Sequence, residues 1–238
     1  VFSGLTSLKR LSLQSNRFRN IPPGAFMGLD ALKELQMASQ IALTIAENTF
    51  QGLEAVTVIT LPRISNMPAG GFRGLSSVLS LDLSSTQYSS GNYRDPFGSV
   101  SGLEPGAFRG LDSLRELKIH DRFARGVPDN IIPLGVFDGL DRLEVLSLRR
   151  NALAGIHPGT FDGLNALTFL DLSDNKIRTL ERRTFAGLAQ LQTLVIAKPN
   201  NYESRSKSEI EPRAFEQLLS LTRLDLSNFC VDELRGHT

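Results

Sequence analysis

The sequence has few of the residues that mark several common classes of protein. Its 238 residues include no Trp, three His, three Tyr and a single Cys, Cys230. One Cys excludes a disulfide scaffold, and it excludes a Cys/His zinc finger built from this chain alone. No run of 18 or more apolar residues occurs, so no segment has the pattern of a transmembrane helix.

The chain also lacks an excess of charge of either sign. Lys and Arg total 26 and Asp and Glu total 25, which gives a net charge of +1. A general nucleic-acid binder usually carries a basic surplus, so we predict no nucleic-acid partner. Hydrophobic residues make up 41% and charged residues 21%, a composition that is typical of a globular chain and not of a disordered one.

The sequence does contain a repeat that runs along the whole chain. Counted forward from a recurring Phe, position +3 is always Leu, +6 is Leu or Val, +9 is Leu or Ile, and +11 is Leu, Met or Ile. The pattern holds at nine phenylalanines, which we expect to form a structural spine: Phe2, Phe26, Phe50, Phe72, Phe108, Phe137, Phe161, Phe185 and Phe215.

Each position of the repeat has a physical role. Apolar residues at +9 and +11 alternate with polar ones, which predicts one face of a short strand. Gly at +2 in eight of the nine copies suits a turn with positive φ. A unit of this size cannot bury its own apolar edge, but stacked units can. The pattern resembles the leucine-rich repeat, so we predict an α/β-type repeat solenoid: a horseshoe with a parallel β-sheet on the concave face and an irregular convex side.

Position +14 holds the Asn of the leucine-rich repeat pattern in three copies, as Asn16, Asn151 and Asn175. There we expect the amide to satisfy backbone groups in the turn after the strand. The other six copies have a different residue, which predicts irregular turns in the middle and at the end of the array.

Three repeats are longer than the usual 24 residues, with Phe-to-Phe spacings of 36, 29 and 30. The additional residues are 87–102, 122–133 and 198–209, and all follow predicted strands. Insertions in repeat proteins often lie on the binding face. All three Tyr of the chain lie in these insertions, among polar residues, as in binding loops. Tolerated surface loops are the alternative interpretation. The candidate ligand-binding residues here are Tyr88, Tyr93, Arg94, Arg122, Phe123 and Tyr202.

A second set of candidates comes from the predicted sheet. Residues at +8, +10 and +12 point to its open face, which solenoids use to hold large partners. Phe169 is an apolar residue on an otherwise polar face, and it is either an interface anchor or a lone exposed aromatic. The candidates on this face are Glu116, Lys118, His120, Arg149, Phe169 and Asp171.

The sequence indicates no enzyme. It has no phosphate-binding glycine loop and no His-Glu-x-x-His metal motif, and no His stands in a recognisable arrangement with a nucleophile. His120 neighbours Asp121, but adjacent residues of a strand point to opposite faces. We expect Cys230 to be a buried small hydrophobe. No catalytic residue, metal or cofactor is predicted.

The repeat unit resembles that of animal extracellular leucine-rich repeat proteins, which include Toll and Toll-like receptors and the antigen receptors of jawless fish. Residues 134–140, Leu-Gly-Val-Phe-Asp-Gly-Leu, are similar to either group, and the interrupted units favour the Toll receptors. The interrupted units Leu81–Phe108, Leu117–Phe137 and Leu191–Phe215 are similar to those in the amino-terminal half of arthropod-type Toll receptors. The resemblance implies part of the extracellular ligand-binding region of an innate immune or developmental receptor. It also implies a protein or microbial ligand, homo- or heterodimers, and membrane attachment only through segments outside this sequence.

The repeats predict a single array over residues 1–238, with about nine repeats and without caps at either end. We therefore expect a fragment of a longer chain. Two alternatives remain open at this point. One is an extracellular adhesion or matrix protein with the same repeats, and the other is a bacterial or intracellular repeat scaffold.

Overall fold

A computed structural model describes residues 2–39, 41–84, 103–120, 131–198 and 207–231. The described elements are strands of two or three residues: β1 (Arg10–Ser12), β2 (Glu34–Gln36), β3 (Val58–Thr60), β4 (Ser80–Asp82), β5 (Glu116–Lys118), β6 (Val145–Ser147), β7 (Phe169–Asp171), β8 (Thr179–Leu180), β9 (Thr193–Val195), β10 (Glu209–Ile210) and β11 (Arg223–Asp225).

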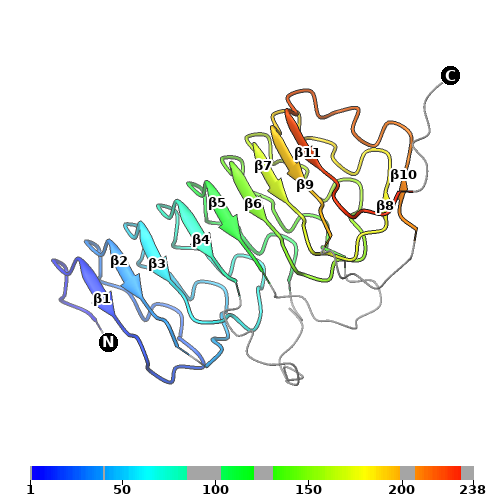
Figure 1. Cartoon of the computed structure of the whole chain (residues 1–238). Coiled ribbons are helices and arrows are strands. Elements are labelled where there is room, and N and C mark those ends of the chain that lie inside the picture. The colour runs from blue at the N-terminus through cyan, green and yellow to red at the C-terminus, as the bar shows by residue number, and fades with distance from the viewer. Residues whose placement is uncertain (1, 40, 85–102, 121–130, 199–206, 232–238) are drawn as a thin grey trace.

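The strands confirm the predicted solenoid with a parallel sheet. Nine of them follow one another along one side of an elongated array, and turns form the opposite side together with β8 and β10 (Figure 1). All pairings are parallel. In each pairing on the sheet side, the +8, +9 and +10 residues of neighbouring repeats are in register, as in Val145–Phe169, Leu146–Leu170 and Ser147–Asp171.

The sheet side is not continuous, which the repeat pattern alone did not predict. Strands β1, β2 and β3 form one sheet, and β4, β5, β6, β7, β9 and β11 form a second. Strands β3 and β4 are neighbours in the array, yet they are not paired (Figure 1). Strands β8 and β10 form a separate two-stranded sheet on the other side.

The core is a single cluster made from the repeat positions. The Leu, Val or Ile residues at +3, +6 and +9 are buried in the middle repeats, for example Leu140, Leu143 and Leu146. Seven of the eight successive pairs of spine Phe rings stack, all but Phe26–Phe50, with centroid separations of 5.6–6.5 Å and interplanar angles of 2–15°. Each stacked ring therefore buries a face against a ring of a neighbouring repeat, which no isolated repeat can do.

Asn side chains close the turns after the strands. Asn151 and Asn175 are buried, and each donates from its amide nitrogen to backbone carbonyls, such as Leu148 O and Leu172 O. Asn16 donates to Leu13 O from an exposed position. In the third repeat Ile64 replaces the pattern Asn, and Asn66 bonds instead to the preceding coil on the side away from the strands: Ile45 N donates to its Oδ1, and its Nδ2 donates to Ile45 O.

Glycine at +2 has positive φ in all eight copies that have it. The space around these glycines differs between repeats. A Cβ built on Gly74 would overlap the carbonyl oxygen of Phe50, whereas a Cβ on Gly163 would have no atom within 4 Å. Glycine is therefore favoured at position 74 both by its positive φ and by the close approach of the preceding coil, whereas at position 163 only the positive φ favours it.

We predict that Gly74→Ala destabilises the array more than Gly163→Ala. The left-handed conformation alone should cost about 1–2 kcal/mol in both variants. The overlap with the backbone of the preceding coil should cost Gly74→Ala a further ~1–3 kcal/mol. Urea unfolding monitored by circular dichroism measures both, and equal losses would contradict the close approach.

Two buried hydroxyls lack a hydrogen-bond partner among the described residues. They belong to Thr160 and Thr184, each in the position before the spine Phe of its repeat. Thr49 has the equivalent position in the third repeat, and its Oγ1 accepts the N–H of Ala46 at 2.9 Å. Val136 fills the same position in the sixth repeat and is fully buried, so the site accepts an apolar residue.

We expect Thr160→Val to raise the free energy of unfolding by roughly 1 kcal/mol, because it removes a buried hydroxyl that has no partner. The matched variant Thr49→Val should lower it by about 1–3 kcal/mol, because the N–H of Ala46 loses its acceptor. Thermal unfolding of both variants checks the difference in sign. A destabilised Thr160→Val would show that its hydroxyl has a partner in solution.

Candidate functional site

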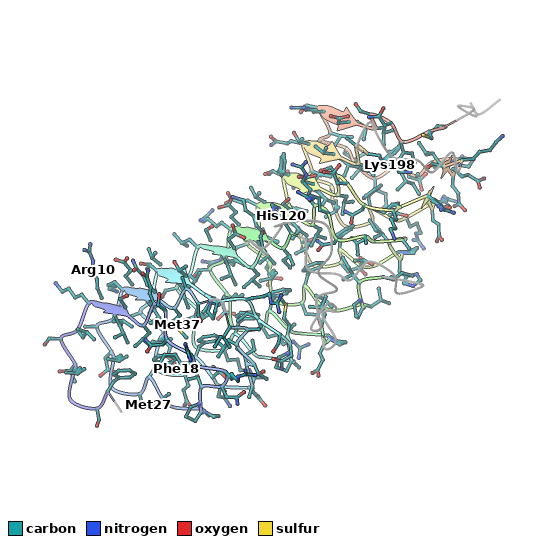
Figure 2. The ribbon with its side chains drawn as sticks, turned by 60° about the horizontal axis from the view of Figure 1, so that its bottom comes forward. Arg10, Phe18, Met27, Met37, His120 and Lys198 are labelled. Carbon is teal, nitrogen blue, oxygen red and sulfur yellow. The ribbon has the colours of Figure 1, made fainter. Side chains whose placement is uncertain are left out.

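The described candidates from the sequence lie together on the open face of the second sheet. Glu116 and Lys118 belong to β5, and Phe169 and Asp171 belong to β7. In β5 and β7 the middle residue is buried while its two neighbours are half-exposed, so the candidates face away from the core. Figure 2 shows His120 at the strand side of the array.

A chain of hydrogen bonds crosses three strands of this face. His120 Nε2 lies 2.7 Å from Ser147 Oγ, and Ser147 Oγ donates to Asp171 Oδ2 at 3.3 Å. The backbone N–H of Ser173 donates to Asp171 Oδ1 at 2.9 Å. Ser147 and Ser173 were not among the candidates from the sequence. Ser147 has the same repeat position as Lys118, and Ser173 has the same repeat position as His120. This correspondence is the signal that could have identified them.

Ser, His and Asp side chains therefore come into contact here, which the sequence did not indicate. In an acyl-transfer triad the His lies between the other two and accepts the proton of the hydroxyl. Here Ser147 lies between His120 and Asp171. The carboxylate of Asp171 only accepts, so the single O–H of Ser147 donates to it, and His120 must donate through Nε2–H. Because the imidazole donates to Ser147, it cannot act as a base toward the Ser147 hydroxyl. The hydrogen bonds among His120, Ser147 and Asp171 therefore hold these side chains in place and do not activate a nucleophile.

Ion pairs fix the charged side chains that lie beside the His120–Ser147–Asp171 hydrogen bonds. Lys118 Nζ lies 2.7 Å from Glu116 Oε1, and Ser80 Oγ donates to Glu116 Oε2 at 2.7 Å. The hydrogen bonds from Lys118 and Ser80 lower the pKa of Glu116, and the bond to Glu116 raises the pKa of Lys118. Arg149 binds Asp174 through Nε and Nη2 at 2.9 and 2.8 Å. These charges are thus fixed in position by neighbours on the same face.

A row of less polar side chains adjoins the ion pairs. Val145, Phe169 and Thr193 are in register on β6, β7 and β9, and all three are half-exposed. Val195 lies beside Asp171 in the next row. We call Val145, Phe169, Thr193 and Val195, with the polar chain His120–Ser147–Asp171, the concave patch.

The remaining candidates cannot be placed. Tyr88, Tyr93, Arg94, Arg122, Phe123 and Tyr202, with most of the three insertions that contain them, lie outside the described residues. Their role in binding stays a prediction.

The C-terminal repeats contain a buried lysine. Lys198 Nζ donates to Ser208 Oγ at 2.9 Å and lies 4.6 Å from the ring centroid of Phe229. Burial lowers the pKa of the amine, and the nearby charge of Arg178 adds to the effect. Cys230, which we expected to be buried, is exposed. Its backbone φ is 61°, and the preceding residue, Phe229, is the one that is buried.

Two further features are absent from the described part of the chain. No group of three or more His, Cys, Asp or Glu side chains there is arranged to hold a metal ion. None of the described residues forms a helix with the length and apolar character needed to cross a bilayer.

Comparison with known proteins defines the class. The family model for leucine rich repeats matches residues 6–66, 131–177 and 141–201, which together make up more than half of the chain. The chain belongs to the leucine-rich repeat family.

Among solved structures, 259 chains match. One is the chain in a crystal structure of a TLR13-ssRNA13 complex, with 26% sequence identity and a TM-score of 0.75. The match covers 95% of this chain and 30% of that one, so this chain spans less than a third of its length. A comparison with curated proteins finds no match.

The lysine gives a pH-dependent prediction. Because the pKa of Lys198 is lowered in the folded state, the unfolded chain binds more protons between that pKa and the ordinary value of about 10.4. Its contribution to stability should therefore rise with pH across this interval and be constant below it. The difference in unfolding free energy between the native protein and Lys198→Met, measured by urea titration from pH 7 upward, tests this. A flat difference would show that the amine is not desolvated.

Proposed function

We propose that this chain is a protein-recognition module of a Toll-like receptor, located in the extracellular region that binds the ligand. The observation that carries the proposal is the concave patch, in which an apolar row lies next to charges and hydroxyls that are already fixed by one another. Likeness to the TLR13 structure over 95% of the chain supports the receptor context.

The patch has the properties of a protein-binding surface. Apolar and aromatic side chains at the centre of an interface supply most of the binding energy, and a surrounding polar ring excludes water. Phe169 is central in the row, between Val145 and Thr193. The ring around it includes Ser147 and Asp171, whose mutual hydrogen bond reduces the entropy lost when a partner binds.

Charge favours a protein over RNA as the ligand. The TLR13 structure contains ssRNA, so RNA is the second ligand to consider. RNA binding draws on unneutralised Lys and Arg side chains that contact phosphates. On the described face, by contrast, Arg10 pairs with Glu34, Lys118 with Glu116, and Arg149 with Asp174. These pairs bring the local charge close to neutral and match the net charge of +1.

Phe169→Asp tests this proposal. We expect it to weaken the affinity for a secreted protein ligand by about 30-fold or more, as for an interface residue worth ~2 kcal/mol. The ligand is isolated by cross-linking to the native protein in extracellular fluid, and its affinity is then measured by biolayer interferometry. Leu134→Asp is the matched control, because Leu134 is 54% exposed and lies outside the sheet.

Three outcomes are informative. Loss of affinity in Phe169→Asp with native affinity in Leu134→Asp supports the patch. Equal affinity of both variants places the binding surface elsewhere on the array. Tight binding of single-stranded RNA to the native protein, with a steep dependence on salt concentration, would replace the protein ligand with a nucleic acid.

A further inference from the structure

The junction between β3 and β4 differs from every other junction on the sheet side. At the other junctions, two successive N–H groups where a strand begins donate to the carbonyl just before the preceding strand, as Arg115 and Glu116 do to Leu79 O. One more N–H donates past the end, as Met37 does to Thr60 O. In the described residues, the equivalent bonds from Leu79, Ser80 and Leu61 are not formed.

The opposite side of the same junction is hydrogen-bonded. Glu104 N donates to Met67 O at 3.0 Å, and Gly70 N donates to Gly106 O at 2.9 Å. Ala69 N also donates to Glu104 Oε2 at 3.0 Å. Closer to the sheet, Ser77 Oγ donates to Glu54 O at 2.6 Å. Arg73 also forms an ion pair with Glu47 across the junction.

The spine is tight at this junction as well. The rings of Phe50 and Phe72 stack with a centroid separation of 6.0 Å and an interplanar angle of 8°. Gly74 lies so close to the Phe50 carbonyl that no Cβ would fit. The two coils are therefore in close contact along the spine, but their strands are not hydrogen-bonded to each other. Beside the unpaired strands, Val58 is 55% exposed and Leu79 is 48% exposed.

The sequence explains this local arrangement. The third repeat has a Phe-to-Phe spacing of 22, two residues below the usual 24. Both missing residues fall between β3 and Met67, because Met67 keeps the usual five-residue distance to the next spine Phe. This shorter return path also includes a buried Pro62, which has no N–H to donate. Because the segment from β3 to the convex side is two residues shorter than in a regular repeat, β4 does not lie within hydrogen-bonding distance of β3.

From this geometry we propose that the β3–β4 junction is a hinge. The segment with β1, β2 and β3 and the segment from β4 to β11 rotate as two units about the bonded spine between Phe50 and Phe72. Rotation changes the spacing of β3 and β4, and with it the curvature of the concave face. No strand hydrogen bond has to break for this motion, whereas bending at any other junction of the sheet side breaks the hydrogen bonds that join the paired strands. The inference stands independently of the proposed function.

Distances between spin labels test the hinge. Labels at Ser12→Cys and Asp82→Cys span β1 to β4 across the junction, and labels at Lys118→Cys and Val195→Cys span the same number of strand steps, from β5 to β9, within the second sheet. Both pairs are introduced with Cys230→Ser, because Cys230 is exposed. Double electron–electron resonance should give a distance distribution at least twice as wide for the first pair. Equal widths would overturn the proposal.

Hydrogen exchange tests the same point on the unmodified protein. The amides of Leu79 and Ser80 should exchange at least tenfold faster than those of Arg115 and Glu116, which occupy the equivalent positions one repeat later. Equal protection would mean that β3 and β4 are paired in solution, and it would overturn the hinge even if labelled variants failed to fold.

Discussion

The structure depends on contact between successive coils. No repeat contains enough residues to bury its own Leu side chains, and the spine Phe rings are covered by the coils beside them. The same contact satisfies the backbone, because strands of two or three residues pair only with neighbours in the next coil. Stability is therefore distributed along the array, and a change in one repeat acts chiefly on the two repeats beside it.

That constraint also produces the candidate site. Parallel strands in strict register place the same repeat position of each coil in one row, so side chains 24 or more residues apart in the chain become neighbours. His120, Ser147 and Asp171 form a hydrogen-bonded chain for this reason. The row containing Phe169 arises in the same way. A leucine-rich repeat protein can vary these outward residues freely, because the inward ones determine the fold.

The irregular third repeat shows how a small change in length becomes a large structural effect. Two missing residues on the return path leave the core residues of the third repeat buried and the spine stacked. Only the pairing of β3 with β4 is lost. Since the coils remain bonded along the opposite side, the array keeps its continuity while the concave face gains a place where its curvature can change.

The sequence by itself determined the repeat, the parallel sheet, the stacking phenylalanines and the outward direction of Glu116, Lys118, Phe169 and Asp171, because each follows from spacing within one coil. Only the tertiary structure decided which side chains meet. The direction of the hydrogen bonds at Ser147, the bonds of Asn66 to the backbone of Ile45, the exposure of Cys230 and the gap between β3 and β4 all depend on how one coil lies against the next. Periodicity fixes what a residue faces within its own coil, but contacts between coils depend on local chain length and turn geometry, which the repeat pattern leaves open.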